Sequence, residues 1–416
     1  MKNYWKSKLL LTAIVSVFLL AVNSCTDSVL NDQSATNELQ VKNGNIEKQS
    51  YIVVLSDNEL NTELTKVKGY EKKGLTVQSA AAGVLKRAGI ADGEIGFVYS
   101  TALTGFSVKI PPGQLKQLED DPSVKSVEKD QVVSLNPIIN KGPSGSKPGH
   151  GGGGNGGGGG TTSSETIPWG ISRVGGPVNY TGSGVAWIID TGVDFTHPDL
   201  NVGVSQSATF VSGTTNANDD NGHGTHVAGI IAAIYNNGIG VAGVAAGATV
   251  VPVKVLNRRG SGTVSGVIAG VDYVAVNGHS GDVANMSLGG GISTSLDNAV
   301  LGASGVVKFA IAAGNDAADA SNYSPARVNG SNVYTISAMD NKDDWAYFSN
   351  YGPPVDYCEP GVNIYSCYKN DGYATLSGTS MATPHMAGLL LLGKISTGGY
   401  VNDDPDHNND PIGVHN

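Results

Sequence analysis

The sequence has few cysteines, no excess of basic residues and no apolar run that would span a bilayer comfortably. Its 416 residues include 3 cysteines, and 36 acidic residues against 26 basic ones give a formal net charge of −10. A nucleic-acid partner requires a concentrated basic face, so this balance argues against one. The main apolar stretch, Leu9 to Val22, is too short for a transmembrane helix. A chain of this length predicts two globular units with extensions.

The N-terminus has the pattern of an export signal. Lys2, Lys6 and Lys8 precede an apolar stretch with the length of a signal-peptide core. The stretch ends in VNSC, which resembles a bacterial lipobox and predicts lipidation of Cys25; an ordinary secretion signal with an incidental cysteine is the alternative. Residues 1–25 are therefore interpreted as a lipoprotein-type signal peptide, and the product as a cell-envelope lipoprotein, an extracellular protein or both.

The remaining two cysteines, Cys358 and Cys367, lie nine positions apart. In an exported chain, two further cysteines favour a disulfide between them. Two buried thiols are the alternative, because the sequence does not show whether the Cβ atoms approach closely enough.

Composition divides the rest of the chain into five parts. Residues 26–49 are polar and predict a tether, and the glycine-rich residues 137–166 predict a flexible linker. Between them, residues 50–136 predict a small domain of strands and helices. Residues 167–395 predict the large domain, and residues 396–416 a polar tail.

The two domains have different patterns of secondary structure. In residues 50–136 the order is β-α-β-β-α-β, which predicts a small ferredoxin-like α+β sandwich. In residues 167–395 strands alternate with helices, and the strands are continuous apolar runs such as VVPVKVL. This pattern predicts an α/β fold with a mostly parallel central sheet and helices on both faces. Functional groups in such sheets gather beyond the carboxyl ends of the strands.

Three polar side chains lie beside glycine at predicted strand ends or helix starts: Asp190, His223 and Ser380. A serine hydroxyl becomes a good nucleophile when a base takes its proton and a buried carboxylate orients that base. The alternatives are that Asp190 and Ser380 cap helices. His223 and His226 at i and i+3 could hold a metal, but no acidic third ligand follows at a recognisable spacing, and the glutamate of the zinc-protease motif is absent.

The blocks DTGVDFTHPDL, HGTHVAGIIAA and SGTSMATPHMAG resemble the three signature blocks of the subtilisin-like serine proteases, in the same order. The resemblance runs from about Pro168 to about Gly393. It implies that Ser380 is the nucleophile, that His223 is the general base and then the general acid, and that Asp190 orients His223.

The resemblance also implies the parts that bind a peptide. The block FAIAAGND matches the oxyanion block of the family, so Asn315 should donate its side-chain amide to the developing oxyanion. The blocks NMSLGGG and RRGSGTV resemble the edge segments that pair with an extended substrate. The implied substrate-binding residues are Gly260, Ser261, Gly262, Ser287, Leu288, Gly289, Ala312, Ala313 and Gly314. Their small side chains predict room for a large apolar substrate side chain.

The resemblance implies a structural metal but no catalytic cofactor. Calcium would be held by Asp199, Asn237 and the carbonyl groups of Ile239 and Val241, since calcium prefers oxygen ligands.

The first domain resembles the inhibitory propeptide of these proteases, through YIVVL, LTGFSVKI and VKSVEKDQVV. The family's domain assists folding and covers the active site until it is cut off. We therefore expect a self-processing zymogen that is cut between about residues 135 and 166 and acts on proteins or peptides.

Two other functions are alternatives. One is a catalytically inactive peptide-binding surface protein on the same fold. The other is an esterase with the same triad. The complete set of Asp190, His223, Asn315 and Ser380 argues against the first, and the propeptide and edge segments argue against the second. After the serine helix the chain departs from the family, because the polar, acidic residues 396–416 replace the expected strands and closing helix.

Overall fold

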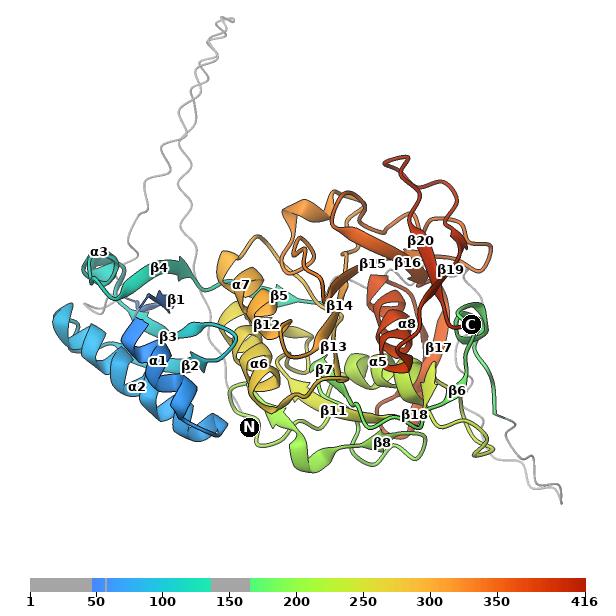
Figure 1. Ribbon diagram of the computed structural model, residues 1–416, viewed down its shortest axis with the longest axis horizontal. Coiled ribbons are helices and arrows are strands. Elements are labelled where there is room, and N and C mark those ends of the chain that lie inside the picture. The colour runs from blue at the N-terminus through green and yellow to red at the C-terminus, as the bar shows by residue number, and fades with distance from the viewer. Residues whose placement is uncertain (1–46, 57, 136–164) are drawn as a thin grey trace, which may run out of the picture. The chain divides into compact units, whose positions relative to one another are not determined.

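The computed structural model describes residues 47–56, 58–135 and 165–416 (Figure 1). The predicted signal peptide with Cys25, nearly all of the tether and nearly all of the linker lie outside these residues. Within the described part of the chain, no helix combines the length and the apolar character needed to cross a membrane.

Residues 49–134 contain the predicted β-α-β-β-α-β order with one additional helix and one additional strand. Four antiparallel strands form a sheet in the order β2-β3-β1-β4. Val53, Phe106 and Leu118 are fully buried in the core of this unit, which explains the apolar strand pattern. The elements are β1 (Gln49–Leu55), α1 (Asn58–Lys66), α2 (Tyr70–Arg87), β2 (Glu94–Ser100), β3 (Thr104–Ile110), η1 (Pro112–Gln114), α3 (Leu115–Glu119), β4 (Val124–Lys129) and β5 (Val132–Ser134).

The large domain is built on a sheet of eight strands in the order β16-β15-β14-β13-β7-β11-β8, with β9 also paired to β11. All of its ladders are parallel, as the sequence pattern predicts. The strands are β7 (Ala186–Asp190), β8 (Asn201–Val202), β9 (Ala208–Thr209), β11 (Thr249–Lys254), β13 (Val283–Met286), β14 (Lys308–Ala312), β15 (Val333–Met339) and β16 (Val355–Pro360).

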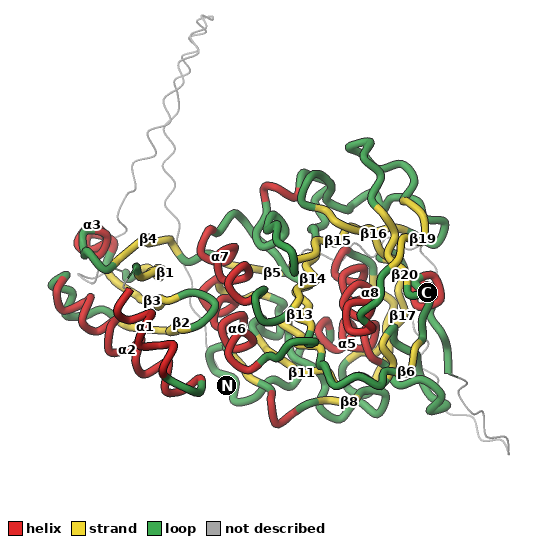
Figure 2. Tube along the Cα trace, viewed as in Figure 1, coloured by secondary structure: helices red, strands yellow, loops and turns green. Residues whose placement is uncertain are grey.

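Helices cover both faces of this sheet (Figure 2). Along β7, Ile188 belongs to one apolar cluster and its neighbours Trp187 and Ile189 to another. The first cluster includes residues of α5 (His223–Ala232) and α8 (Thr379–Leu392), and the second includes residues of α6 (Val264–Asn277) and α7 (Thr294–Ala303). Both faces of β7 are therefore buried, which explains its continuous apolar run.

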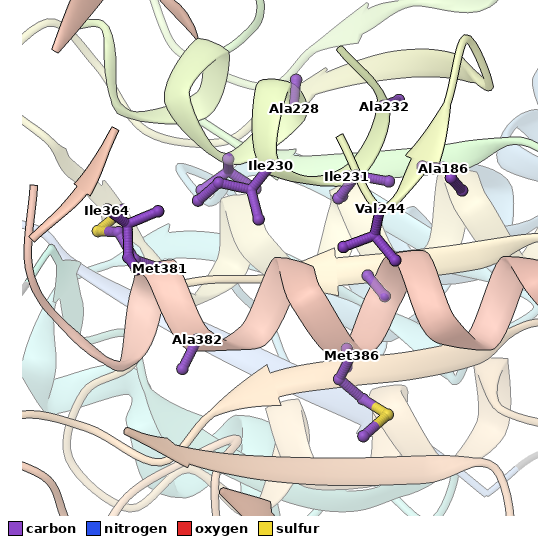
Figure 3. Packing of buried hydrophobic residues seen from close by; sticks show 14 of the residues in the cluster. Ala186, Ala228, Ile230, Ile231, Ala232, Val244, Ile364, Met381, Ala382 and Met386 are labelled. Carbon is purple, nitrogen blue, oxygen red and sulfur yellow. The ribbon is translucent and has the colours of Figure 1, made fainter. Parts of the chain in front are cut away.

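Helices α5 and α8 pack on the same face of the sheet (Figure 3). The side chains of Ile230 and Val244 point toward α8, while Met386 points from α8 toward the strands on its other side. Every residue of α5 is buried. This packing fixes the N-termini of both helices, which carry His223 and Ser380.

The C-terminal segment is folded against the large domain. Strands β19 (Ser396–Tyr400) and β20 (Pro411–Val414) form an antiparallel pair, and β20 packs against β16. Val401 and Ile412 are fully buried. The polar composition conceals these few apolar anchors, so residues 396–416, predicted as a polar tail, add a strand pair to the large domain.

The remaining short elements lie around the large sheet. They are α4 (Trp169–Arg173), β6 (Val178–Asn179), η2 (Val204–Gln206), β10 (Ala245–Ala246), β12 (Ser261–Thr263), η3 (Ala320–Asn322), β17 (Ile364–Tyr368) and β18 (Gly372–Leu376).

Candidate active site

Asp190 and His223 meet at the carboxyl edge of the large sheet. The five buried residues of β7 end at Asp190, and α5 begins at His223. The Nδ1 atom of His223 lies 2.8 Å from Oδ1 and 2.9 Å from Oδ2 of Asp190, and both side chains are buried. An ionised carboxylate only accepts hydrogen bonds, so Nδ1 carries the proton and Nε2 remains a base.

The start of α5 depends on a glycine. Gly222 has a φ of 113°, in the left-handed region that favours glycine. A Cβ atom at this position would lie 2.3 Å from the ring carbon Cζ of Tyr368. Glycine therefore permits both the sharp entry into the helix and the packing of β17 beside His223.

Ser380 lies in the first turn of α8 and points to a neighbouring carbonyl group. Its Oγ atom donates to the carbonyl oxygen of Ser287 at 3.2 Å. Nε2 of His223 is buried and has no hydrogen-bond partner among the described residues. The structure thus forms the Asp190–His223 pair but not the hydrogen bond between Ser380 and His223.

Asn315 lies beyond the end of β14, and its amide is oriented by α8. Its Oδ1 atom accepts from the backbone N–H of Thr379 at 2.8 Å and from the hydroxyl of Thr379 at 2.9 Å. These two contacts fix which way the amide faces. Its Nδ2 group, the donor of the amide, is then available to another group. This orientation is suited to an oxyanion hole.

One pocket contains the two predicted walls together with Ser380. Segment 287–289 lies on one side and segment 312–314 on the other. Gly290, Tyr323 and Ala326 also line the pocket but were not predicted. Tyr323 and Ala326 flank a Ser-Pro turn distant from the signature blocks, and no local pattern in the sequence indicates their position.

The predicted edge segments hold the last strand of the small domain. β5 pairs antiparallel with β12, with Ser134 opposite Ser261 and Val133 opposite Gly262. Ser134 also forms an antiparallel bridge with Gly289, and the N–H of Leu135 donates to the carbonyl oxygen of Gly260 at 2.8 Å. β5 therefore lies between the two segments, where an extended peptide substrate would pair.

A buried carboxylate of α6 joins the large domain to the small one. Asp272 of α6 accepts the backbone N–H groups of Ser100, Thr101 and Ala102 at 2.7–3.0 Å. Burial raises the pKa of Asp272, and these hydrogen bonds oppose the increase.

In the opposite direction, side chains of the small domain cap helices of the large one. Asp130 accepts from the N–H of Ser265 at 3.0 Å, and Glu128 accepts from the N–H of Ser295 at 2.9 Å. A carboxylate at a helix N-terminus satisfies free N–H groups and interacts favourably with the helix dipole. No local sequence pattern indicates these roles for Asp130, Glu128 and Asp272.

The residues proposed for calcium lie close together. Asp199 accepts from Nδ2 of Asn237 at 2.6 Å and from the N–H of Val241 at 3.0 Å. The Oδ1 atom of Asn237 accepts from the N–H of Ile239 at 3.0 Å. Burial is the main cause of a raised pKa at Asp199. Among the described residues, no cluster of three or more His, Cys, Asp or Glu side chains could hold a metal.

The predicted disulfide is wrong. Cys358 and Cys367 are both free and buried. Cys358 packs with Met339, Val401 and Ile412, whereas Cys367 belongs to the cluster of α5 and α8. The two thiols belong to separate apolar clusters, so proximity in sequence did not bring them together.

The pairing of Asp190 with His223 beside a peptide-holding cleft agrees with the sequence comparisons. Residues 183–396 match the model described as Subtilase family. The chain belongs to the subtilase family. Residues 50–136 match the model described as Peptidase inhibitor I9, so the small domain is a propeptide of that type.

Similar proteins are subtilases from several sources. M-protease of Shouchella clausii (strain KSM-K16) is 41% identical over 296 residues, covering 69% of this chain and 68% of that protein. Extracellular serine proteinase of Thermus sp. (strain Rt41A) is 37% identical over 357 residues, which cover 82% of this chain and 79% of that protein. Alkaline serine exoprotease A of Vibrio alginolyticus is 40% identical over 327 residues; these are 76% of this chain but only 56% of that longer protein.

A solved structure gives the same family. The crystal structure of a cold adapted subtilisin-like serine proteinase has a TM-score of 0.51 and 41% sequence identity, covering 59% of this chain and 96% of the other. This subtilase is therefore a serine protease with an I9-type propeptide, which implies synthesis as a zymogen.

Proposed function

We propose that this subtilase is an exported, self-processing endopeptidase that uses Ser380, His223 and Asp190 as its triad. The observation that carries the proposal is the position of β5, held on both sides by β12 and Gly289 in the manner of a bound peptide. The Asp190–His223 pair supplies an oriented base in the same domain.

The first step requires a change in one hydrogen bond. The hydroxyl of Ser380 leaves the carbonyl of Ser287 and donates to the free Nε2 of His223. Ser380 Oγ then attacks the substrate carbonyl while its proton passes to Nε2. The carboxylate of Asp190 stabilises the imidazolium through Nδ1.

The following steps complete the hydrolysis. Nδ2 of Asn315 and the backbone N–H of Ser380 donate to the oxyanion of the tetrahedral intermediate. The C–N bond breaks as the imidazolium gives its proton to the leaving amine, which leaves an acyl ester on Ser380. Water, deprotonated by His223, then cleaves this ester and regenerates the hydroxyl.

The pocket favours a large apolar side chain just before the cleaved bond. Its walls contain small residues such as Gly289, Ala312 and Gly314, and the described lining residues carry no charged side chain. A peptide panel varied at this position should give the highest kcat/KM with large apolar residues. Best cleavage after acidic or basic residues would contradict the proposed preference.

Labelling of the active-site serine tests the catalytic assignment. The wild-type chain should react with a fluorophosphonate probe and hydrolyse casein, whereas the Ser380→Ala variant should do neither. A folded wild-type chain that binds its propeptide but fails both assays would support the inactive surface protein. Probe labelling without casein hydrolysis would support an esterase.

We also propose export through residues 1–25, with Cys25 lipidated, and self-cleavage between about residues 135 and 166. Mass spectrometry of the expressed chain should find a lipid on Cys25 and a cut in this interval. The Ser380→Ala variant is the control and should remain uncut. An uncut wild-type chain would contradict the self-processing.

Structural calcium is the remaining part of the proposal. The carboxylate of Asp199, the amide oxygen of Asn237 and the carbonyl groups of Ile239 and Val241 are oxygen ligands suited to calcium, and Asp199 is buried. We expect EDTA to lower the Tm of the wild-type protein and excess calcium to restore it. The Asp199→Asn variant should lose this response. A wild-type Tm that does not depend on EDTA or calcium would contradict the calcium site.

A further inference from the structure

Asp219, four residues before the candidate base His223, accepts an unusually large number of hydrogen bonds. Its Oδ1 atom accepts from the hydroxyl of Thr191 and from the N–H groups of Asn221 and Gly222, each at 2.9 Å. Its Oδ2 atom accepts from the N–H of Thr225 at 3.0 Å and from the hydroxyl of Thr225 at 2.6 Å. The side chain is buried, so these contacts replace its hydration.

Thr191 connects Asp219 to the candidate acid Asp190. The N–H of Thr191 donates to Oδ1 of Asp190 at 2.7 Å, while its hydroxyl donates to Asp219 and accepts from the N–H of Gly224 at 2.9 Å. One hydroxyl therefore joins the end of β7 to the first turn of α5.

The two neighbours of His223 are both held by this network. Gly222 donates to Asp219, and Gly224 donates to Thr191. Because both neighbours are glycines, they have no side chains that could anchor the backbone by packing. Together with the packing of α5 and the hydrogen bond from the N–H of His223 to Oδ1 of Asn221, these backbone hydrogen bonds set the position of the imidazole relative to Asp190.

We propose that Asp219 is a positioning residue that sets the geometry between Asp190 and His223. The inference rests on the proposed function, in which this pair acts as the catalytic base. Asp219 does not line the pocket beside Ser380. Its effect is therefore expected in the chemical step rather than in substrate binding.

A buried lysine holds Thr191 from the side of β11. Nζ of Lys254 donates to the carbonyl oxygen of Thr191 at 2.5 Å, to Oδ1 of Asp220 at 2.6 Å and to the carbonyl oxygen of Leu256 at 3.0 Å. The backbone carbonyl and the side chain of Thr191 are thus both fixed by charged groups. Such charge-assisted hydrogen bonds are stronger than neutral ones.

A matched control lies beside the start of β7, at the opposite end of that strand from Asp190. Asp282 is also buried, and it accepts from the N–H of Val185, the indole N–H of Trp187 and the N–H of His279 at 2.9–3.0 Å. An aspartate-to-asparagine change there removes a comparable buried acceptor. It leaves the contacts of Asp190 and His223 intact.

The decisive measurement is the pH profile of kcat/KM for the wild type and for Asp219→Asn, Thr191→Val and Asp282→Asn, each with its Tm. Asp219→Asn should lower kcat by about 10- to 100-fold, since small misplacements of catalytic groups have effects of this size. KM should change by less than about twofold, because the contacts that bind the substrate equally in the ground state and the transition state are unchanged. Asp282→Asn should lower the Tm but leave kcat and the profile as in the wild type.

The acidic limb of the profile should also move to lower pH in Asp219→Asn. Loss of one anion and a looser contact with Asp190 both destabilise the imidazolium of His223. In the described part of the chain, other charged or titratable groups around the pair include His226 on α5, Lys254 on β11, Asp220, and Tyr368 and Lys369, which donate to the backbone just before α5. All of them remain in the variant.

Thr191→Val tests the bridge itself, because it removes the hydroxyl and keeps the shape of the side chain. It should reproduce the effect of Asp219→Asn, and Thr191→Ser should recover most of the lost kcat. If Asp219→Asn does not fold, the valine and serine variants provide the test. The inference would be overturned if Asp219→Asn or Thr191→Val had the same kcat and the same acidic limb of the pH profile as the wild type. An equal loss of kcat in Asp282→Asn would also overturn it. An inactive wild-type chain would instead refute the proposed function.

Discussion

Oδ1 of Asp272, on a helix of the protease domain, accepts the backbone N–H of Ala102 of the propeptide at 2.8 Å. The same carboxylate accepts from the two preceding residues of the propeptide turn. A single side chain of the enzyme therefore satisfies three consecutive backbone groups of its inhibitor.

Replacing Asp272 should weaken the hold of the propeptide. In Asp272→Ala the three buried N–H groups lose their acceptor, and each unsatisfied group costs about 1–3 kcal/mol. We expect at least about a tenfold faster release of the cleaved propeptide, measured as the delay between self-cleavage and full activity. Asp282→Ala, which removes buried acceptor contacts within the protease domain, should leave this delay unchanged; an equal acceleration there would contradict the role of Asp272.

The oxyanion role of Asn315 can be separated from its structural role. Asn315→Asp keeps an oxygen that accepts from both groups of Thr379 but loses the Nδ2–H donors. We expect kcat to fall by about 100- to 1000-fold, the range seen when one such donor is removed, with little change in KM. A rise in KM with an unchanged kcat would show that the amide contributes to binding only.

The C-terminal hairpin should make the fold less stable as the pH rises from about 4 to about 7. Asp410 accepts from the hydroxyl of Ser337 at 2.8 Å, and burial raises its pKa to about 7. Because the folded-state pKa exceeds the ordinary value, the stabilisation is complete below about pH 4 and is lost as the pH rises to about 7. The loss from this group is at most about 1.4 kcal/mol per pH unit.

Asparagine at position 410 should remove this dependence. The Tm of the Ser380→Ala chain, which cannot digest itself, is measured between pH 4 and 8 with and without Asp410→Asn. Asp403→Asn is the matched control, because Asp403 is an exposed residue between β19 and β20. If the Tm still changed with pH in Asp410→Asn but not in Asp403→Asn, the assignment of this pH dependence to Asp410 would be contradicted.

The two buried cysteines should behave as protected thiols. Burial raises the pKa of both Cys358 and Cys367 well above the ordinary value, which keeps them protonated and unreactive. We expect a thiol reagent to label neither residue in the native protein and both in denaturant, and a reducing agent to leave the Tm unchanged. A lower Tm after reduction would show that the two cysteines form a disulfide.

The sequence predicted the parts of the molecule whose chemistry depends on local pattern. Asp190 ends a continuous apolar strand and His223 begins a helix between glycines, so both their elements and their meeting at one sheet edge could be anticipated. Asn315 was recognised through its block, whereas the orientation of its amide came only from Thr379, a residue distant in the chain.

Other features depend on contacts that no local pattern contains. Asp272 looks like an ordinary helix residue in the sequence, and its function depends on a turn of the propeptide 170 residues away. The C-terminal segment is mostly polar, and Val401 and Ile412 alone do not predict that it folds. The predicted disulfide between Cys358 and Cys367 was wrong for the same reason. A separation of nine residues does not specify which apolar cluster each side chain joins.

The placement of β5 gives dilution a role in controlling this enzyme. While the inhibitor strand belongs to the same chain, its local concentration at the cleft stays the same however few molecules are present. Once the connection is cut, the strand is retained only by its contacts with the protease domain, and its occupancy depends on the amount of protein per volume. Under the proposed export and self-cleavage, molecules that spread into the surrounding medium would therefore become active earlier than those that remain concentrated at the cell surface.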